Sequence, residues 1–161
     1  MSNPKLRTYA QRSIVKALRD GLAPTALQIP GQRDDVNEAT EEWVAYYPLE
    51  VPRWPSRKGV FAGTVVFQVS CFARFAEQRT DEQTDAPWVL ADRVRTILDG
   101  AGILVRSYGD EPVSDVACLQ LGDGAEVYLD ERRLGVLPPA GGSVSNCHAV
   151  VLTYRGSMGA T

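Results

Sequence analysis

Hydrophobic and polar residues alternate most regularly along residues 59–75. Every second residue from Val65 to Phe75 is apolar, and the positions between them mix apolar residues with Gln68, Ser70 and Arg74. Successive side chains of a β-strand point to opposite faces of its sheet. The pattern therefore predicts a long strand with one face in the core and the other face only partly exposed to water.

A helical pattern follows this strand after a polar run. Residues 76–85 are almost wholly polar and are expected to form an exposed loop, because they have little to bury. Asp85 can then cap a helix that has Pro87 in its first turn, and Gly100 can end that helix. The expected helix has one apolar side, made of Leu90, Ala91, Val94, Ile97 and Leu98.

A second amphipathic pattern lies near the N-terminus. Asn3 can cap a helix with Pro4 at its first position, and Gly21 marks the end of this helix. Its outer face is basic, and its apolar stripe consists of Leu6, Ala10, Ile14, Ala17 and Leu18. A short apolar segment at residues 26–29 and a polar loop at residues 30–42 follow.

Shorter segments predict the remaining strands. Residues 43–51 alternate as a strand in which Pro48 requires a sheet edge or a bulge, and we expect this strand to pair with residues 59–75. Short strands are also expected at residues 103–108, 116–121, 125–129 and 147–154, joined by turns rich in glycine and proline.

Together these elements predict one α+β domain over residues 1–161. We expect a mainly antiparallel sheet, with mixed pairing allowed, and two helices packed on one of its faces. Exposed loops are expected near residues 30–42, 52–59, 76–85 and 109–115. With 161 residues, of which 44% are hydrophobic, the chain is long enough to bury the core of one domain.

Composition and charge exclude several classes of protein. No segment has the uninterrupted apolar length that a membrane span needs, and the N-terminus lacks the apolar core of a signal peptide, which predicts residence in a cytoplasm. A formal net charge of −3 argues against a general nucleic-acid binder. Cys71, Cys118 and Cys147 lie in apolar runs without CxxC spacing, so we expect buried thiols rather than a disulfide or a zinc site.

The residues give no indication of catalysis. His148 is the only histidine, and we expect it to be a packed or surface side chain, because no second histidine or reactive cysteine converges on it. The glycine-rich segments lack the lysine of a phosphate-binding loop. We therefore predict that the protein is not an enzyme and has no catalytic, cofactor-binding or metal-binding residues.

Two polar loops are candidates for contact with a partner protein. The loop at residues 52–59 combines cations, an aromatic residue and two prolines, and its alternative is a solvated turn with the tryptophan packed on the sheet. The loop at residues 76–85 suits a segment that orders only on docking, and its alternative is a disordered turn. The residues predicted to make these contacts are Arg53, Trp54, Arg57, Lys58, Arg79 and Asp81.

Two segments carry a family resemblance. They are Gly63-Thr-Val-Val-Phe-Gln-Val-Ser-Cys-Phe72 and Trp88-Val-Leu-Ala-Asp-Arg-Val-Arg-Thr-Ile97. With the order of elements around them, the chain resembles the tail terminator proteins of long-tailed bacteriophages and phage-like particles (minor tail protein U-like). The resemblance is most specific over residues 59–98, and residues 30–42 and 110–142 are longer than in a minimal member.

The resemblance implies a structural virion protein. Such proteins form a six-membered ring on the last ring of the tail tube, end polymerisation of the tube and offer a joining surface to the neck of the head. The implied partners are other copies of the chain in a homohexamer, the tail tube protein and the neck or connector protein, with DNA only passing through the lumen. Neither a cofactor nor a membrane is implied.

The implied location is the tube–neck junction of a virion tail, after synthesis in the cytoplasm of the host bacterium. One alternative is another head-to-tail connector or neck (head completion) protein of the same kind of particle. The other alternative is a cytoplasmic ligand-binding α+β domain, for which the candidate polar set is Tyr46, Tyr47, Arg106 and Tyr108.

Overall fold

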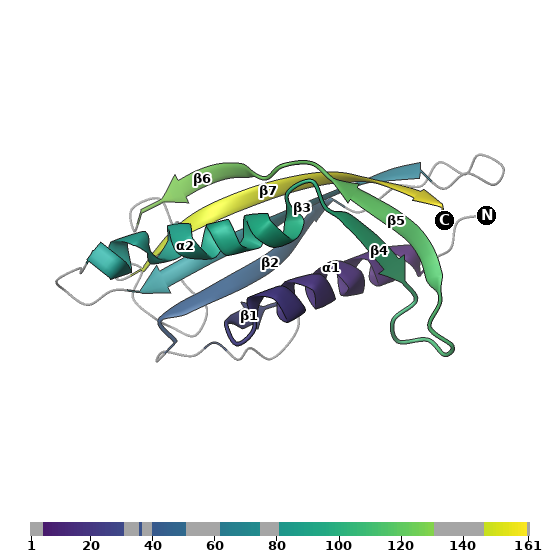
Figure 1. Ribbon diagram of the computed structural model, residues 1–161, viewed down its shortest axis with the longest axis horizontal. Coiled ribbons are helices and arrows are strands. Elements are labelled where there is room, and N and C mark those ends of the chain that lie inside the picture. The colour runs from purple at the N-terminus through teal and green to yellow at the C-terminus, as the bar shows by residue number, and fades with distance from the viewer. Residues whose placement is uncertain are drawn as a thin grey trace.

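The computed structural model describes residues 5–30, 36, 40–50, 62–74, 81–130 and 147–160. Within these residues the chain forms two helices and seven strands (Figure 1). Their bounds are α1 Leu6–Leu22, β1 Ala26–Gln28, β2 Glu42–Glu50, β3 Ala62–Arg74, α2 Asp81–Leu98, β4 Gly102–Arg106, β5 Asp115–Leu121, β6 Ala125–Leu129 and β7 Cys147–Ala160.

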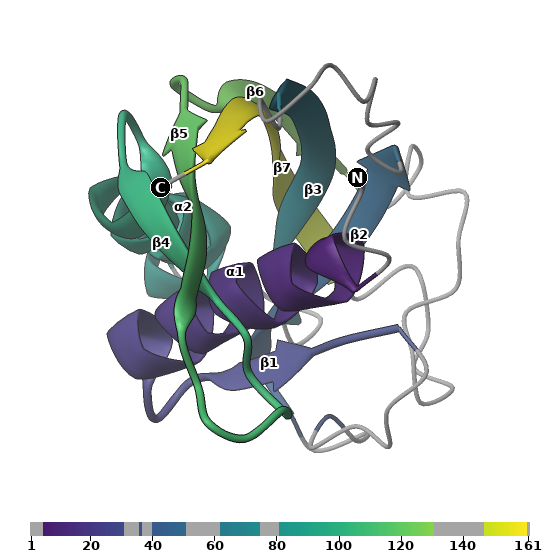
Figure 2. The ribbon, with the colours of Figure 1, turned by 90° about the vertical axis from the view of Figure 1, so that its right-hand side faces the viewer.

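The strands form one sheet in the order β1-β2-β3-β7-β5-β4, with β6 also paired to β7. β1 and β2 are parallel, and the other pairs of described strands are antiparallel. β6 and β5 follow one another along β7, which they meet at residues 149–153 and 156–160. α1 packs against β4 and β1 (Figure 2). Two helices and a mixed, mainly antiparallel sheet agree with the predicted α+β class.

The predicted alternation is observed in β3. Its inward residues are all buried, namely Val65, Phe67, Val69, Cys71 and Ala73. On the opposite face, Gln68, Ser70, Phe72 and Arg74 are half-buried. β2 pairs with β3 as expected, and the register shifts between Pro48 and Glu50, which confirms the predicted irregularity at the proline.

The main core joins the buried residues of both helices to the inward face of the sheet. α1 contributes Leu6, Tyr9, Ala10, Ile14, Leu18 and Leu22, and α2 contributes Leu90, Ala91, Val94 and Leu98. Ala17, at the edge of the predicted stripe, is half-buried. At the centre of the sheet, Phe67 lies between Tyr46 and Tyr154, with ring centroids 5.5 Å from each. Burying each large apolar side chain stabilises the fold by roughly 1.5–3 kcal/mol.

Both helix starts differ from the predictions. α1 is preceded by Lys5, whose side chain makes no capping hydrogen bond, and Asn3 and Pro4 lie outside the described residues. α2 begins at Asp81, so the predicted loop is wrong over residues 81–85, and Asp85 lies inside the helix. Acidic residues at the start of α2 suit the positive end of the helix dipole. Pro87 lies inside the helix, where it cannot donate a backbone hydrogen bond.

β7 is longer than predicted. It extends six residues beyond Tyr154, to Ala160, where glycine, serine and methionine weaken any local strand signal. β3 pairs with this segment on one side and β5 pairs with it on the other. Gly156 fits between these neighbours, since an added Cβ would lie 2.7 Å from Leu121 Cδ2. Pairing on both sides therefore overrides the weak local propensity.

The three cysteines do not share one environment. Cys71 and Cys147 are buried as predicted, but the prediction is wrong for Cys118, which is exposed. β5 turns Ala117, Leu119 and Leu121 into the core, so alternation places Cys118 on the opposite face. Burial raises the pKa of the Cys71 thiol to about 12 and that of the Cys147 thiol to about 11.

We expect a maleimide reagent to modify one thiol per folded chain rapidly. Cys118 is accessible, whereas the other two thiols are buried and their raised pKa values leave little reactive thiolate. Mass spectrometry of the native and denatured protein measures the count, and Cys118→Ser is the matched control. Rapid modification of two or three thiols in the native state would contradict the burial of Cys71 and Cys147.

Candidate assembly surfaces

The face of the sheet that points away from the main core carries two rows of aligned side chains. One row crosses the sheet as Ala45, Ser70, Val151 and Val127, and the next as Tyr47, Gln68, Thr153 and Ala125. These eight residues come from β2, β3, β7 and β6, and together they are referred to as the outer sheet face. Strand register alone brings them together, because paired residues of neighbouring strands point to the same side.

The outer sheet face has no charged side chain. Tyr47 is 59% exposed and Val127 is 53% exposed, at opposite sides of the sheet. Between them, the Gln68 amide donates a hydrogen bond of 3.4 Å to the Thr153 hydroxyl. Depletion of charge with retention of aromatic and aliphatic groups distinguishes the cores of protein interfaces from ordinary surface. This face is therefore suited to contact with another protein.

One end of the same side of the sheet is already covered by the chain itself. Trp43 is fully buried and stacks on Phe72 with ring centroids 5.0 Å apart, and the Arg74 guanidinium lies 5.0 Å from the Trp43 ring centre. Val36 packs in this second, smaller core. Along the side of the sheet that points away from the main core, this packed region is followed by the outer sheet face, and the next outward residue of β7 after Thr153 is the exposed Arg155.

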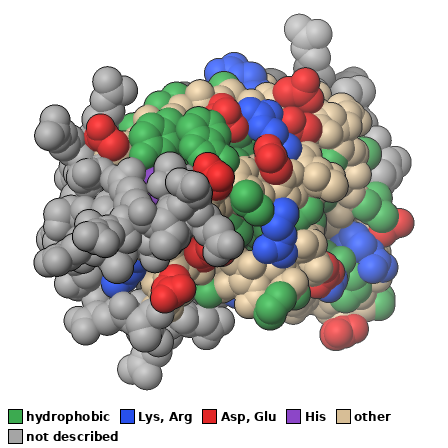
Figure 3. Space-filling view, turned by 60° about the vertical axis from the view of Figure 1, so that its left-hand side comes forward, with side chains coloured by type: hydrophobic (Ala, Val, Ile, Leu, Met, Phe, Trp, Pro, Cys, Tyr) green, Lys and Arg blue, Asp and Glu red, His purple; other side chains and the backbone are tan. Residues whose placement is uncertain are grey.

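A second exposed apolar area lies where α2 passes β6. Trp88, 38% exposed, stacks on Tyr128 with ring centroids 5.5 Å apart, and the neighbouring Val89 is 56% exposed. Tyr128 meets the buried His148 edge-on, and its hydroxyl lies 3.2 Å from His148 Nδ1. We refer to Trp88, Val89 and Tyr128 as the aromatic shoulder. Figure 3 views this end of the molecule and shows hydrophobic side chains gathered on its surface.

Of the six predicted contact residues, the described part of the chain contains only Asp81. Arg53, Trp54, Arg57, Lys58 and Arg79 lie outside it, and Asp81 is the first residue of α2. Sequence reasoning missed both the outer sheet face and the aromatic shoulder. The signal for the first was present, because β2, β3 and β7 each carry uncharged residues at alternate outward positions, but it becomes a surface only once their register is known.

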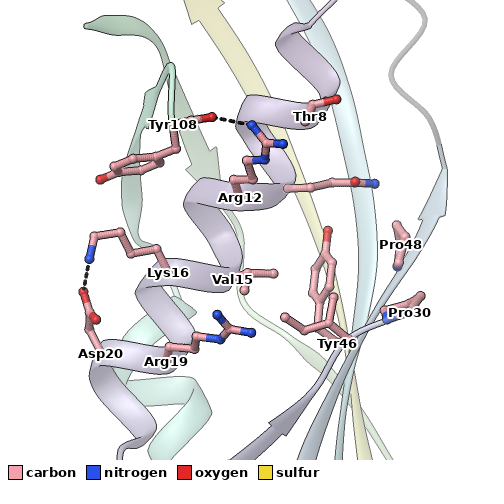
Figure 4. Close-up of a pocket in the computed structure, with 12 residues that line it drawn as sticks. Thr8, Arg12, Val15, Lys16, Arg19, Asp20, Pro30, Tyr46, Pro48 and Tyr108 are labelled. Atoms are coloured by element: carbon pink, nitrogen blue, oxygen red, sulfur yellow. Dashed lines mark hydrogen bonds and ion pairs between the residues drawn. The ribbon is translucent and has the colours of Figure 1, made fainter. Parts of the chain in front are cut away.

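The polar set proposed for a ligand-binding domain converges only in part. Tyr46 and Tyr108 line one groove beside α1 (Figure 4), whereas Tyr47 belongs to the outer sheet face. Arg106 lies over the ring of Tyr108, with 5.9 Å between the guanidinium carbon and the ring centroid, and pairs with the Asp115 carboxylate. Two of the four residues thus border one groove, and Tyr47 and Arg106 do not line it.

Among the described residues, no cluster of three or more histidine, cysteine or acidic side chains has the arrangement needed to bind a metal ion. Neither α1 nor α2 has the apolar length required to cross a membrane.

Comparisons with known proteins give a fold but no family. No protein-family model matches the sequence, and no curated protein matches it. The chain is similar to a chain in the solved structure "Virion of native gene transfer agent (GTA) particle", with 12% identity and a TM-score of 0.56. The match covers 98% of this chain and 99% of the other. At this level of identity the similarity shows that the two chains share a fold over almost their whole length.

Proposed function

We propose that this protein is a structural component of a phage-like particle and acts there as a tail terminator. In this role a ring of six copies caps the tail tube, ends polymerisation of the tube and forms the joining surface to the neck of the head. Its partners are neighbouring copies, the tail tube protein and the neck protein, and DNA passes through the lumen of the ring.

The observation that carries the proposal is the similarity in fold to a chain of a gene transfer agent virion over almost the full length of both chains. The resemblance of residues 59–98 to tail terminator proteins supports the role of tail terminator over other structural roles within such a particle. The first line of support rests on the arrangement of the strands, and the second rests on two sequence segments and the order of the elements around them.

The surface of the chain is compatible with a ring. A closed ring of identical chains requires two different surfaces on each chain, one of which contacts the other on the next copy. The outer sheet face and the aromatic shoulder are two such surfaces, and both expose apolar side chains that are costly to leave in water. We assign the outer sheet face to the contact with a neighbouring copy.

Electron microscopy of particles assembled without this chain tests the proposal. A tail terminator limits growth of the tube, so deletion should give headless tubes of uncontrolled and excessive length. Restoring the chain in trans should restore tubes of one length.

Two other results would contradict a tail terminator. Tubes of normal length beside filled but unattached heads would identify a neck or head completion protein instead. Particles indistinguishable from the wild type would remove the proposed role in assembly altogether.

A further inference from the structure

The aromatic shoulder has an acidic border on α2. Asp85 and Asp92 lie one helical turn before and one turn after Trp88 and Val89, so the four side chains share the exposed face of the helix. Both carboxylates are exposed, and neither forms an ion pair with a cation in the described part of the chain. Figure 3 shows acidic side chains beside the hydrophobic side chains at this end of the molecule.

The arginines that follow Asp92 in the sequence have other partners. Arg93 donates a hydrogen bond of 2.8 Å to the Leu22 carbonyl oxygen, which holds its guanidinium against the end of α1. Arg95 lies 2.9 Å from the Asp99 carboxylate. Among the described residues, neither arginine therefore pairs with the Asp92 carboxylate, which can accept a cation of another molecule.

The outer sheet face has a basic border. Arg155 is the next outward residue of β7 after Thr153, and it is exposed. Its carbonyl oxygen accepts a hydrogen bond from the Gly122 N–H, but its guanidinium forms no ion pair with a carboxylate of the described chain. Arginine is enriched in protein interfaces. The exposed residues paired across neighbouring strands just beyond it are uncharged, namely Thr64, Gln120 and Ser157.

The two borders lie at similar distances from the uncharged parts of their surfaces. Asp92 is one helical turn from Val89, or about 5–6 Å between Cβ atoms. Arg155 is two residues beyond Thr153 along β7, or about 7 Å. If Trp88 and Val89 lie on the row of the outer sheet face that contains Thr153, the Asp92 carboxylate is within reach of the long Arg155 side chain.

We propose that the aromatic shoulder of one copy docks on the outer sheet face of the next copy, with Asp92 of the first paired to Arg155 of the second. The apolar contact supplies most of the affinity, and the charge pair at its border fixes the orientation of the two copies. The two surfaces differ, so the contact is heterologous and can repeat around a ring. This inference rests on the proposed ring and names its contact.

Disulfide cross-linking of the purified protein tests the contact without tail tubes. Cys118→Ser first removes the exposed thiol. In that background, a chain with both Asp92→Cys and Arg155→Cys should form a ladder of linked species on mild oxidation at high protein concentration. A mixture of the two single variants should give dimers at most, and each single variant alone should stay unlinked. Asp85→Cys with Arg155→Cys is the matched control and should cross-link much less.

Reversal of the charges tests the pair itself. Arg155→Asp alone and Asp92→Arg alone should each weaken self-association, measured by analytical ultracentrifugation, by about tenfold or more, because like charges then meet. The chain with both changes should regain association, whereas Asp85→Arg should not rescue Arg155→Asp. All three positions are exposed, so circular dichroism should show an unchanged fold.

Three results would overturn the proposed contact. They are the absence of a ladder from the double cysteine variant, linked dimers from a single cysteine variant alone, and failure of the double charge reversal to restore association. The tail role is judged separately by deletion of the chain. A ladder together with normal tube length after deletion would reject the tail role and keep the contact, and overlong tubes without a ladder would do the reverse.

Discussion

Asp99→Ala is expected to lower the free energy of unfolding by about 3 kcal/mol. Asp99 follows the last residue of α2, and its carboxylate joins three elements. One oxygen accepts hydrogen bonds from the Tyr154 hydroxyl at 2.6 Å and from the Gly124 N–H at 3.1 Å. The other oxygen accepts a charge-assisted bond of 2.9 Å from Arg95. Removing the carboxylate breaks all of these bonds together.

The expected loss of stability is large because Asp99→Ala leaves a buried hydroxyl group without an acceptor. Tyr154 is fully buried, so loss of its acceptor strands a hydroxyl in the core, which costs about 1–3 kcal/mol. Gly124, in the turn between β5 and β6, sits so close to Tyr154 that an added Cβ would lie 2.7 Å from the ring. Urea denaturation of the two proteins measures the difference.

Asp115→Ala is the matched control for this prediction. Asp115 also accepts from an arginine, Arg106, at 3.1 Å, but both side chains of the pair are well exposed. Exposed pairs contribute little, so the free energy of unfolding should change by less than about 1 kcal/mol. Equal losses in the two variants would contradict a special role for the Asp99 network.

The same network predicts a dependence on pH. Burial alone would raise the pKa of Asp99, but the hydrogen bonds from Tyr154, the Gly124 N–H and Arg95 outweigh it and hold the pKa below its ordinary value of 3.8. A carboxylate with a lowered pKa stabilises the fold above the unfolded value and loses this contribution as pH falls through the folded value. The difference in stability between wild type and Asp99→Asn should therefore be largest near neutral pH and shrink below pH 3.8.

The contribution of Asp99 is isolated only by the difference in the free energy of unfolding between wild type and Asp99→Asn. The pKa of Asp110 is also lowered, by hydrogen bonds from the Tyr9 hydroxyl and from Lys5, so the wild type has a second acid-sensitive group. Asp110 is unchanged in Asp99→Asn, and its contribution cancels when the two proteins are compared at each pH. A constant difference across the acid range would mean that the charge of Asp99 does not stabilise the fold.

Local patterns in the sequence were sufficient to predict which residues are buried when the buried face follows from the period of a single helix or strand. The alternation of β3 and the apolar stripe of α2 depend only on periods of two and about 3.6 residues. Both are observed, although Ile97 of the stripe is only half-buried. The continuation of β7 past Gly156 was missed, because it depends on two neighbouring strands that are distant in sequence. Cys118 was misjudged because short apolar runs do not reveal which face of a strand is inward.

The candidate surfaces were less predictable than the fold for the same reason. The outer sheet face combines residues 45, 70, 151 and 127, whose order in space follows from the register of three strand pairs. Nothing in the local sequence of β6 distinguishes Val127 from an inward valine. The aromatic shoulder likewise depends on α2 crossing β6, which places Trp88 over Tyr128.

We expect Val127→Asp to prevent ring formation on tail tubes while leaving the fold intact. Val127 is 53% exposed in the free chain, so a carboxylate at this position stays in water and should change the free energy of unfolding by less than about 1 kcal/mol. In the proposed contact between copies, the same carboxylate would be buried in the uncharged outer sheet face without a cation to pair with. Burying an unpaired charge costs several kcal/mol.

The free-energy cost of burying this unpaired carboxylate applies to every contact of a closed ring. A loss of about 3 kcal/mol per contact weakens each contact by more than about 100-fold, and a ring contains as many contacts as copies. The variant should therefore fail to restore tail length when it is supplied to particles that lack the wild-type chain. Electron microscopy measures tube length, and circular dichroism of the purified variant measures its fold.

Leu104→Asp is the control that tests the location of this effect. Leu104 is also an exposed apolar residue, at 44%, but it lies on β4, at the opposite end of the strand order from β1 and outside the outer sheet face. The same gain of charge there should leave tail length unchanged. Failure of Leu104→Asp with normal assembly of Val127→Asp would mean that the copies meet through β4 and β5, and the assignment of the outer sheet face would be wrong.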